Sequence, residues 1–470
     1  MVTFDTEPFD LSLQSAQYKV FVNGSPVSAL PARVSAVPFN QVWPGYQRPI
    51  NQTELASFSA FDMEAPARIT AECARPFKDV KIRPSSYGIL PETDGTKISF
   101  TLNEPKPLTV ECDGWHGALH LFPNAPDKYG IKAKTEKIRY FGPGVHHPGK
   151  MALNSGETLY VADGAIVYGC VEAKHQREIK IIGRGVLDGS KIPRKGAPGL
   201  ISLYNCEDVF IEGVIMRDPS SWTLITAKCK NVAIENVKLI GLWRYNADGI
   251  DVVNSSGVTI SRSFLRTFDD SIVMKGLKSW GGDATDPGFM KNILSEKCVI
   301  WCDWGRALEI GAETCADYFD DIVFKDCDII HNSHVALDIQ HGDRAKITNV
   351  LFEDIRVEMD DFNPMYSFQK EPGEFYTDAG RDFCPRLFYI GIAGTMWSKD
   401  TVLGSVDGVT VKDVKVTSKL KTESVISGAD ENHTVENVAF KNLTINGKKI
   451  TSADEMDLKI KSHVKNVTFR

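Results

Sequence analysis

A short apolar pattern recurs from about residue 155 to the end of the chain, and this repeat restricts the possible folds more than any other feature. Its clearest copies occupy residues 209–214, 232–237, 258–261, 322–327, 350–355, 409–414 and 438–443. The first two intervals are 23 and 26 residues, and two later ones are 28 and 29. A period in the twenties with alternating β-branched residues predicts a right-handed parallel β-helix, because the runs are too short for helical or leucine-rich repeats.

The first 125 residues lack this repeat. They contain short alternating runs at residues 18–22 and 97–101, with turns at Asn23-Gly24 and Asp94-Gly95, and they are rich in proline. Such runs, closed by tight turns, are typical of an all-β sandwich. We therefore expect an all-β protein with a small β-sandwich domain over residues 1–125 and a right-handed parallel β-helix domain over residues 126–470.

Composition excludes several functional classes. The net charge is −7, which argues against nucleic acid or an anionic membrane as the main partner. No apolar run is long enough to span a bilayer. No basic segment followed by an apolar core begins the chain, so we expect a cytoplasmic protein if Met1 is native and a secreted or periplasmic one if the chain was trimmed. The ten cysteines lack a metal-binding spacing, so we expect buried thiols, one or two disulfides at most, and no metal or cofactor.

A second alternating strand in each turn is predicted to carry outward polar side chains. Aligned on an inward apolar residue, its fourth position gives the column Thr226, Asp251, Val273, Glu309, Asp338 and Tyr389. Its first position gives Thr223, Asp248, Asp270, Arg306, Val335 and Arg386. Because neighbouring turns lie about 4.8 Å apart, these charges should gather on one face and line a cleft.

Three aspartates in this cleft are candidates for acid–base chemistry. Asp248 follows Asn246, and Asp269 and Asp270 stand at the same register one turn later. Inverting hydrolysis of a glycoside needs a protonated carboxyl for the leaving oxygen and carboxylates that hold water on the opposite side, about 6.5–9.5 Å away. Crowded carboxylates raise at least one pKa, which suits a general acid. The dipeptide alone is weak support, since Asp-Asp recurs at 320–321 and 360–361.

The segment Asn246-Ala-Asp248-Gly-Ile-Asp251, followed by Asp269-Asp270, resembles family 28 glycoside hydrolases, the polygalacturonase group, over roughly residues 140–450. The resemblance implies a right-handed parallel β-helix and inversion at the anomeric carbon. It also implies Asp269 as general acid, with Asp248 and Asp270 positioning the attacking water. The additional N-terminal β-domain is similar to that of the related family 49 dextranase and isopullulanase group.

Departures from the family pattern affect the substrate more than the chemistry. The usual Gly-His-Gly is Gly305-Arg306-Ala307, and the usual Arg-Ile-Lys, which binds the galacturonate carboxylate, is Asp338-Ile339-Gln340. A neutral sugar, or a uronate bound by Arg244, Lys275 or Arg306, is therefore expected.

The substrate-binding candidates are outward polar residues and nearby aromatic ones. They are Asn246, Asp251, Lys275, Arg306, Glu309, Asp338, Gln340, Trp243, Tyr245 and Tyr389, with Trp304 as a further stacking residue. Insertions at residues 276–288 and 360–385 are expected to border the cleft. Two alternatives stay open, a polysaccharide lyase and a non-catalytic carbohydrate-binding solenoid. The expected partner is a poly- or oligosaccharide, and the sequence leaves the oligomeric state open.

Overall fold

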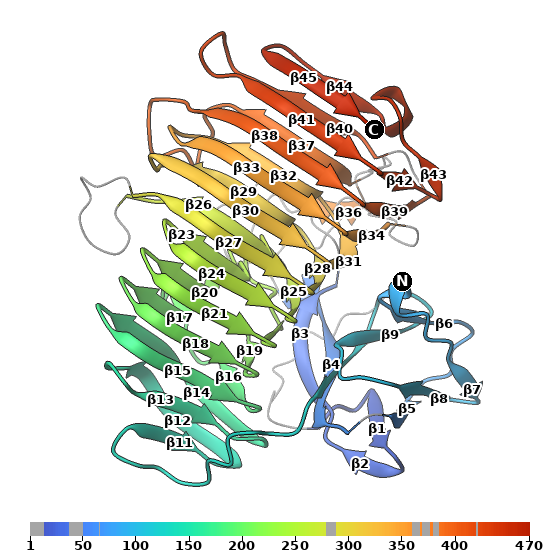
Figure 1. Ribbon diagram of the computed structural model, residues 1–470. Coiled ribbons are helices and arrows are strands. Elements are labelled where there is room, and N and C mark those ends of the chain that lie inside the picture. The colour runs from blue at the N-terminus through green and yellow to red at the C-terminus, as the bar shows by residue number, and fades with distance from the viewer. Residues whose placement is uncertain are drawn as a thin grey trace.

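The structure is a computed structural model that describes residues 14–36, 50–64, 66–278, 288–359, 367–368, 377–378, 385–419 and 422–470. These residues form β-strands and three single 3₁₀ turns, η1 (Ile50–Gln52), η2 (Ser85–Tyr87) and η3 (Asp454–Met456). They include no helix that is long and apolar enough to cross a membrane. The strands build a long right-handed parallel β-helix with a smaller two-sheet body beside it (Figure 1), which confirms the predicted fold class.

The N-terminal body consists of two five-stranded sheets packed face to face. The first sheet has the order β2 (Ser25–Val27), β1 (Tyr18–Val22), β5 (Ala67–Cys73), β8 (Lys97–Leu102) and β7 (Glu92–Asp94). The second has the order β3 (Leu30–Ser35), β4 (Thr53–Asp62), β10 (Leu119–Asn124), β9 (Leu108–Cys112) and β6 (Val80–Arg83). Alternating apolar residues of both sheets form one core. The domain boundary near residue 125 remains a proposal, placed between the end of β10 and the start of β11.

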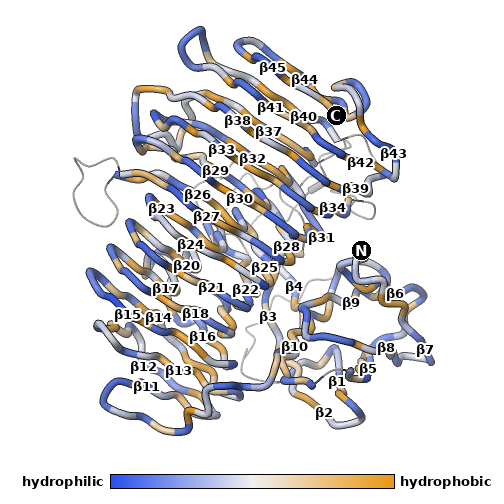
Figure 2. Tube along the Cα trace, in the orientation of Figure 1, coloured by the Kyte–Doolittle hydropathy of each residue, from blue (hydrophilic) through white to orange (hydrophobic). Residues whose placement is uncertain are grey.

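One side of the β-helix is a twelve-stranded parallel sheet made by the repeat. Its strands are β11 (Ile138–Phe141), β13 (Thr158–Val161), β15 (Arg177–Gly183), β18 (Glu207–Glu212), β21 (Lys230–Glu235), β24 (Ser256–Ser261), β27 (Met290–Glu296), β30 (Tyr318–Lys325), β33 (Lys346–Glu353), β38 (Ser405–Lys412), β41 (Val435–Lys441) and β45 (Val464–Phe469). The alternation places every second residue in the core, and orange and blue alternate along these strands in Figure 2. Like side chains stack between turns, as Phe324 does on Phe352 with ring centroids 5.0 Å apart.

The other side comprises two rows of strands. After β12 (Gly144–Ala152) and β14 (Ala165–Lys174), which extend along both, each turn contributes one strand to each row. The short-strand row is β16 (Val186–Asp188), β19 (Ile215–Arg217), β22 (Lys238–Ile240), β25 (Phe264–Thr267), β28 (Val299–Cys302), β31 (Asp328–Asn332), β34 (Arg356–Met359), β39 (Lys415–Ser418) and β42 (Thr444–Ile445). The long-strand row is β17 (Gly199–Tyr204), β20 (Trp222–Ala227), β23 (Ile250–Val253), β26 (Ile272–Gly276), β29 (Arg306–Thr314), β32 (Val335–His341), β37 (Arg386–Ile392), β40 (Ser424–Ser427) and β44 (Leu458–Ile460). Two small pieces complete the strands, β43 (Lys448–Lys449) and the pair β35 (Ser367–Phe368) with β36 (Thr377–Asp378).

The turn between the twelve-stranded sheet and the short-strand row explains the polar residue next to the end of most copies of the repeat. Asn236, Asp326 and Asp354 stand there with φ of 53°, 50° and 51°. Asn and Asp adopt this left-handed conformation more readily than other non-glycine residues. The repeat therefore encodes the corner of the solenoid as well as its strands.

The sandwich packs on the outer face of the short-strand row. Phe58 and Phe122 of the sandwich lie against Phe264 and Trp301 of the β-helix, and the rings of Phe122 and Phe264 have centroids 5.0 Å apart. Buried polar contacts accompany them. His331 Nε2 lies 2.5 Å from Glu111 Oε1, and Arg83 pairs with Glu111 and with Glu358. The outer faces of β16 to β31 are therefore covered by the sandwich where this cluster forms.

Strand pairing confirms most of the predicted outward columns and corrects one turn. Asp251 pairs with Val273, Val273 with Glu309, Glu309 with Asp338 and Asp338 with Tyr389. In β20, however, Asp251 pairs with Ile225. The prediction that Thr226 and Thr223 occupy the columns is therefore wrong by one residue.

The described cysteines are buried and free. They are Cys73, Cys112, Cys170, Cys206, Cys229, Cys298, Cys302, Cys315 and Cys327. Buried thiols are therefore confirmed for these positions, and no disulfide joins any two of them.

Candidate active site

A cleft of about 680 Å³ opens at the edge of the long-strand row, where the chain enters from the short strands. Its lining is Lys195, Ser221, Trp222, Asn246, Asp248, Asp269, Asp270, Lys275, Trp304, Arg306, Glu309, Ala312, Glu313, His334, Gln340, Thr395, Met396 and Trp397. All three predicted aspartates are in this set. We call this cavity the aspartate cleft.

Two adjacent turns bring the three aspartates together. Asp248 precedes β23 by two residues and Asp270 precedes β26 by two, and Ile250 pairs with Ile272 across these strands. Backbone hydrogen bonds join the two loops, with the Gly249 amide donating to the Asp270 carbonyl oxygen at 2.8 Å. Parallel pairing of the strands thus fixes the spacing of the aspartates.

Glycine at position 305 allows a close approach of the next turn. A Cβ atom on Gly305 would lie 2.4 Å from the backbone nitrogen of Asp270 and 2.6 Å from its Oδ1. Only a residue without a side chain fits this position while Asp269 and Asp270 keep their places. The first glycine of Gly305-Arg306-Ala307 is thus explained by packing against the aspartate pair.

Lys275 lies among the aspartates. Its Nζ is 2.7 Å from Asp248 Oδ2, 3.4 Å from Asp251 Oδ1 and 3.5 Å from Asp270 Oδ2. The ammonium also lies 4.3 Å from the centre of the Trp222 ring, at cation–π distance. Its charge is therefore shared by three carboxyl groups of the protein.

Arg306 supports the same group from the next turn. Its backbone nitrogen donates to Asp270 Oδ1 at 3.2 Å, and its Nη1 is 3.6 Å from the same oxygen. The guanidinium also contacts Asp338 at 3.3 Å and donates to Gln340 Oε1 at 2.8 Å. Both Lys275 and Arg306 are thus occupied by side chains of the protein.

The environments of the neighbouring Asp269 and Asp270 shift the pKa values of these two side chains in opposite directions. Burial raises the pKa of Asp269 well above its usual range, and the charges of Asp248 and Asp270 raise it further. Burial also raises the pKa of Asp270, but Lys275 and Arg306 outweigh it, so that its pKa lies below the usual value. The site therefore favours the protonated form of Asp269 and the ionised form of Asp270. Burial and Asp270 raise the pKa of Asp248 to about 7, against the opposing effect of Lys275.

Three further carboxyls support this arrangement from the long-strand row. Asp251, Glu309 and Asp338 are fully buried or nearly so. Burial raises the pKa of Asp251 and Glu309 well above the usual range and that of Asp338 to about 7. Protonated carboxyls can donate hydrogen bonds, and the Glu309 side chain lowers the pKa of Asp270 in this way. The described residues hold no group of three metal-ligating side chains with suitable geometry.

The predicted binding residues divide into two groups. Asn246, Lys275, Arg306, Glu309, Gln340 and Trp304 line the cleft, whereas Asp251, Asp338, Trp243, Tyr245 and Tyr389 do not. Asp251 and Asp338 lie behind the lining as partners of Lys275 and Arg306. Tyr389 is half-buried one turn beyond Asp338, with the Arg386 guanidinium 5.5 Å from its ring centre.

Three residues expected to bind sugar have other partners. Trp243 donates from Nε1 to Asp218 Oδ1 at 3.1 Å, and Tyr245 is fully buried against Phe268. Arg244, considered as a carboxylate clamp, pairs with Asp218 at 3.1 Å and is equally inward-facing. These side chains fix the loop that carries Asn246 and Asp248. None of the three lines the aspartate cleft, and a contact between them and substrate stays a prediction.

Sequence reasoning missed several lining residues. Trp222 takes the place that the shifted alignment gave to Thr223, since the corrected register puts Trp222 opposite Asp248. Glu313 lies near the end of β29, His334 precedes β32, and residues 395–397 follow β37 without any repeat signal. Of the two predicted bordering insertions, residues 279–287 and most of 360–385 lie outside the described residues.

Comparison with known proteins gives a match in the same region. The model of the family "Glycosyl hydrolases family 28" matches residues 180–366, which include all three cleft aspartates. A dextranase from Arthrobacter sp. (strain CB-8) is 23% identical over 188 residues, covering 34% of this chain and 29% of the relative. Polygalacturonase QRT2 from Arabidopsis thaliana is 22% identical over 196 residues, covering 38% and 41% respectively. The matched part is thus less than half of either relative.

Solved structures share the architecture. Dex49A from Penicillium minioluteum matches with a TM-score of 0.64 and 14% identity, covering 100% of this chain and 96% of that one. An exopolygalacturonase from Thermotoga maritima matches with a TM-score of 0.52 and 18% identity, covering 71% and 83%. At these identities the likeness concerns the fold. Together with the family match, it confirms the resemblance to family 28 and its relation to family 49.

Proposed function

We propose that this chain, with its family 28 segment, is a glycoside hydrolase that cleaves a poly- or oligosaccharide with inversion. The observation that carries the proposal is the aspartate cleft itself. Three buried carboxyl groups from two turns line one cavity, and charges fixed by Lys275 and Arg306 keep one of a neighbouring pair ionised beside a protonated partner. A protonated acid beside an ionised base is the combination that glycoside hydrolysis requires.

In the proposed reaction, Asp269 donates its proton to the glycosidic oxygen as the bond from that oxygen to the anomeric carbon breaks. A water molecule attacks the same carbon from the opposite side, and its proton passes to Asp270. Asp248, positioned by Lys275 at 2.7 Å, accepts the second hydrogen bond of the water. The sum is addition of one water molecule, and the new hydroxyl has inverted configuration.

The cleft favours a sugar without a carboxylate at the cleaved position. A uronate would need a cation to bind it. Lys275 already contacts three carboxyl groups, and Arg306 contacts Asp270, Glu309 and Asp338. The third lysine or arginine of the lining, Lys195, is exposed. Another carboxylate brought into this site would meet an excess of acidic groups. We therefore propose a neutral glycan rather than polygalacturonate as substrate.

The test is reducing-sugar release, with the product anomer followed by NMR, on neutral α-glucans and on polygalacturonate. We expect hydrolysis of a neutral glycan, and Asp269→Asn should reduce kcat by about 10²–10⁴ because general acid catalysis is lost. Asp321→Asn is the matched control, since Asp321 belongs to another Asp-Asp pair, is exposed, and has a φ of 56° that Asn tolerates.

Other outcomes would select an alternative. A product that absorbs in the ultraviolet would indicate elimination by a lyase. Equal turnover in wild type and Asp269→Asn would remove Asp269 from the mechanism. Glycan binding of equal strength in both proteins, without any turnover, would leave a carbohydrate-binding solenoid.

A further inference from the structure

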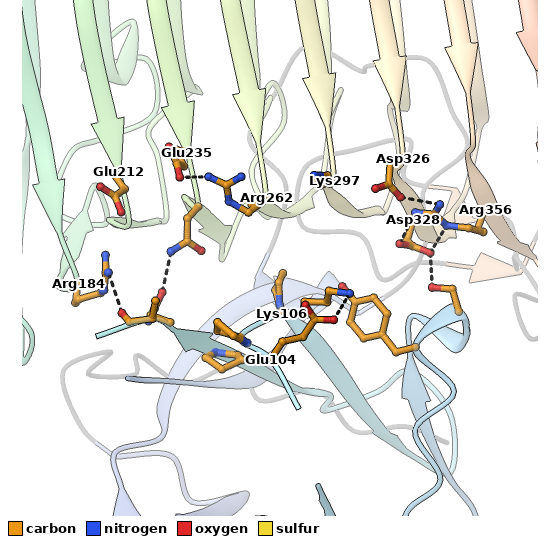
Figure 3. Close-up of a pocket in the computed structure, with 18 of the residues that line it drawn as sticks. Glu104, Lys106, Arg184, Glu212, Glu235, Arg262, Lys297, Asp326, Asp328 and Arg356 are labelled. Carbon is orange, nitrogen blue, oxygen red and sulfur yellow. Dashed lines mark hydrogen bonds and ion pairs between the residues drawn. The ribbon is translucent and has the colours of Figure 1, made fainter. Parts of the chain in front are cut away.

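A second cavity, of about 810 Å³, lies between the sandwich and the β-helix (Figure 3). We call it the junction cleft. One wall consists of residues at successive corners of the β-helix, among them Glu212, Glu235, Arg262, Lys297 and Asp326. These corners are neighbours along the axis, about 4.8 Å apart. The wall therefore presents a regular row of polar groups along the axis of the solenoid.

Charges in the junction cleft largely neutralise one another. Arg262 pairs with Glu235, and Arg356 lies 2.9 Å from Asp326 and 2.8 Å from Asp328. These pairs appear as dashed lines in Figure 3. Lys297 stands between the two groups and forms no ion pair with the residues that the structure describes. A surface with many oriented donors and acceptors but little net charge suits hydroxyl groups better than it suits a multiply charged ion.

The opposite wall belongs to the sandwich and is less polar. It contains the half-buried ring of Tyr87 together with Pro105, Pro107 and Pro126. Lys106 adds an ammonium 5.3 Å from the centre of the Tyr87 ring. One wall of ring faces and one wall of hydrogen-bonding groups match a sugar ring, which has apolar C–H faces and a polar edge.

Contacts between the two domains fix both walls. Ser86 Oγ donates to Asp328 Oδ1 at 2.7 Å, and Asn236 Nδ2 donates to Asn124 Oδ1 at 3.1 Å. Arg184 Nη2 donates to the Ala125 carbonyl oxygen at 3.3 Å. A ligand would enter a site whose shape is already formed, so that little ordering is required on binding.

We propose that the junction cleft is a second binding site for a neutral carbohydrate chain, separate from the aspartate cleft. The choice of carbohydrate among polyhydroxylated ligands rests on the proposed function. The two clefts lie at opposite ends of the same short strands. Asn236 and Arg262 precede β22 and β25, whereas Asp248 and Asp269 follow them. A polysaccharide bound in the junction cleft is thereby kept near the enzyme and raises the local substrate concentration at the aspartate cleft.

The test uses the full-length Asp269→Asn protein on an array of neutral oligosaccharides. Arg262→Asn/Lys297→Asn is introduced into this background, since both positions have positive φ, 50° and 56°, which Asn tolerates. Lys228→Asn is the matched control, because Lys228 is a corner lysine with φ of 51° that lines neither cleft. We expect binding of at least one array glycan to weaken about tenfold in the double variant and to persist in the control, as for loss of a hydrogen bond to a charged group.

Equal binding by the double variant and its control, or no binding to any array glycan, would overturn the proposal. The array does not require turnover, so the two hypotheses fail separately. If wild type hydrolyses a glycan but no array signal depends on Arg262 and Lys297, the junction site alone is rejected. If an array signal does depend on Arg262 and Lys297 but wild type hydrolyses no glycan, the proposed function alone is rejected. Circular dichroism of each variant verifies that it is folded.

Discussion

Replacing Lys275 with Met should shift the pH dependence of hydrolysis without abolishing it. Met has similar volume and removes only the charge, so Asp270 would retain Arg306 alone as its cationic partner. For a pair 3.5 Å apart, Coulomb's law at an effective dielectric constant of about 20 gives an upper bound of about 4.7 kcal/mol, or about 3.5 pKa units. Measured shifts beside a cation are about 1–3 units, so we expect the pKa of Asp270 to rise by that amount.

The direction of the shift in the pH profile follows from the protonation state in which Asp270 acts. Asp270 is needed ionised, and Lys275 with Arg306 lowers its pKa, so the part of the acidic limb that Asp270 causes in wild type lies at that low value. In Lys275→Met the fall should begin at a pH higher by about 1–3 units. Below that point kcat/KM should decrease about tenfold per pH unit, with recovery at higher pH.

The assay is kcat/KM between pH 3 and 9 on the glycan that wild type hydrolyses. Lys291→Met is the control, because Lys291 pairs with Asp320 on the surface of the twelve-stranded sheet. Recovery of activity at high pH separates a shifted base from a misfolded protein. An acidic limb at the same pH in Lys275→Met and wild type would refute the role assigned to Asp270.

Two further predictions concern packing and acid stability. Gly305→Ala should lower both Tm and kcat, because the new Cβ would lie 2.4 Å from the Asp270 nitrogen. The free energy of unfolding should fall by about 1–3 kcal/mol. A variant with wild-type kcat would show that Asp269 and Asp270 can move without loss of activity. Acid should weaken the domain contact, since His331 and Arg83 outweigh burial and hold the pKa of Glu111 below its usual value. The stability from Glu111 is therefore complete above about pH 4.3 and is lost as the pH falls through the folded pKa. Thermal melts from pH 2 to 6 should show a shallower acid decline for Glu111→Gln, and equal slopes would contradict this.

The fold was predictable because the apolar alternation repeats at each turn and its polar corner residues recur with it. The aspartate trio was predictable because residues at the same register of two parallel neighbouring strands lie side by side. The slip at β20 arose where Leu224 and Ile225 are adjacent, because either can be taken as the inward residue. The structure pairs Leu224 with Ile250, which shows that Leu224 is the inward residue.

Aromatic residues and loops were less predictable. Trp243 and Tyr245 precede an outward strand, but their rings pack into the loop, and sequence position alone does not distinguish these orientations. The sequence does contain a signal that the outer face of the short strands is covered. Ile215, Ile240 and Phe264 are apolar residues on the outer side of these strands, where a solvated solenoid would have polar ones.

Stacking by turns gives the molecule a modular organisation. Each turn contacts chiefly the turns before and after it, so the two turns that carry Asp248 and Asp270 form one heritable unit. Whole turns beyond β37 could be gained or lost in evolution without altering the aspartate geometry, whereas an extra turn between β23 and β26 would separate the aspartates by a further 4.8 Å or so. Lineages of this architecture are thus free to lengthen or shorten the solenoid beyond β37, but not between β23 and β32, where successive turns assemble the aspartate cleft.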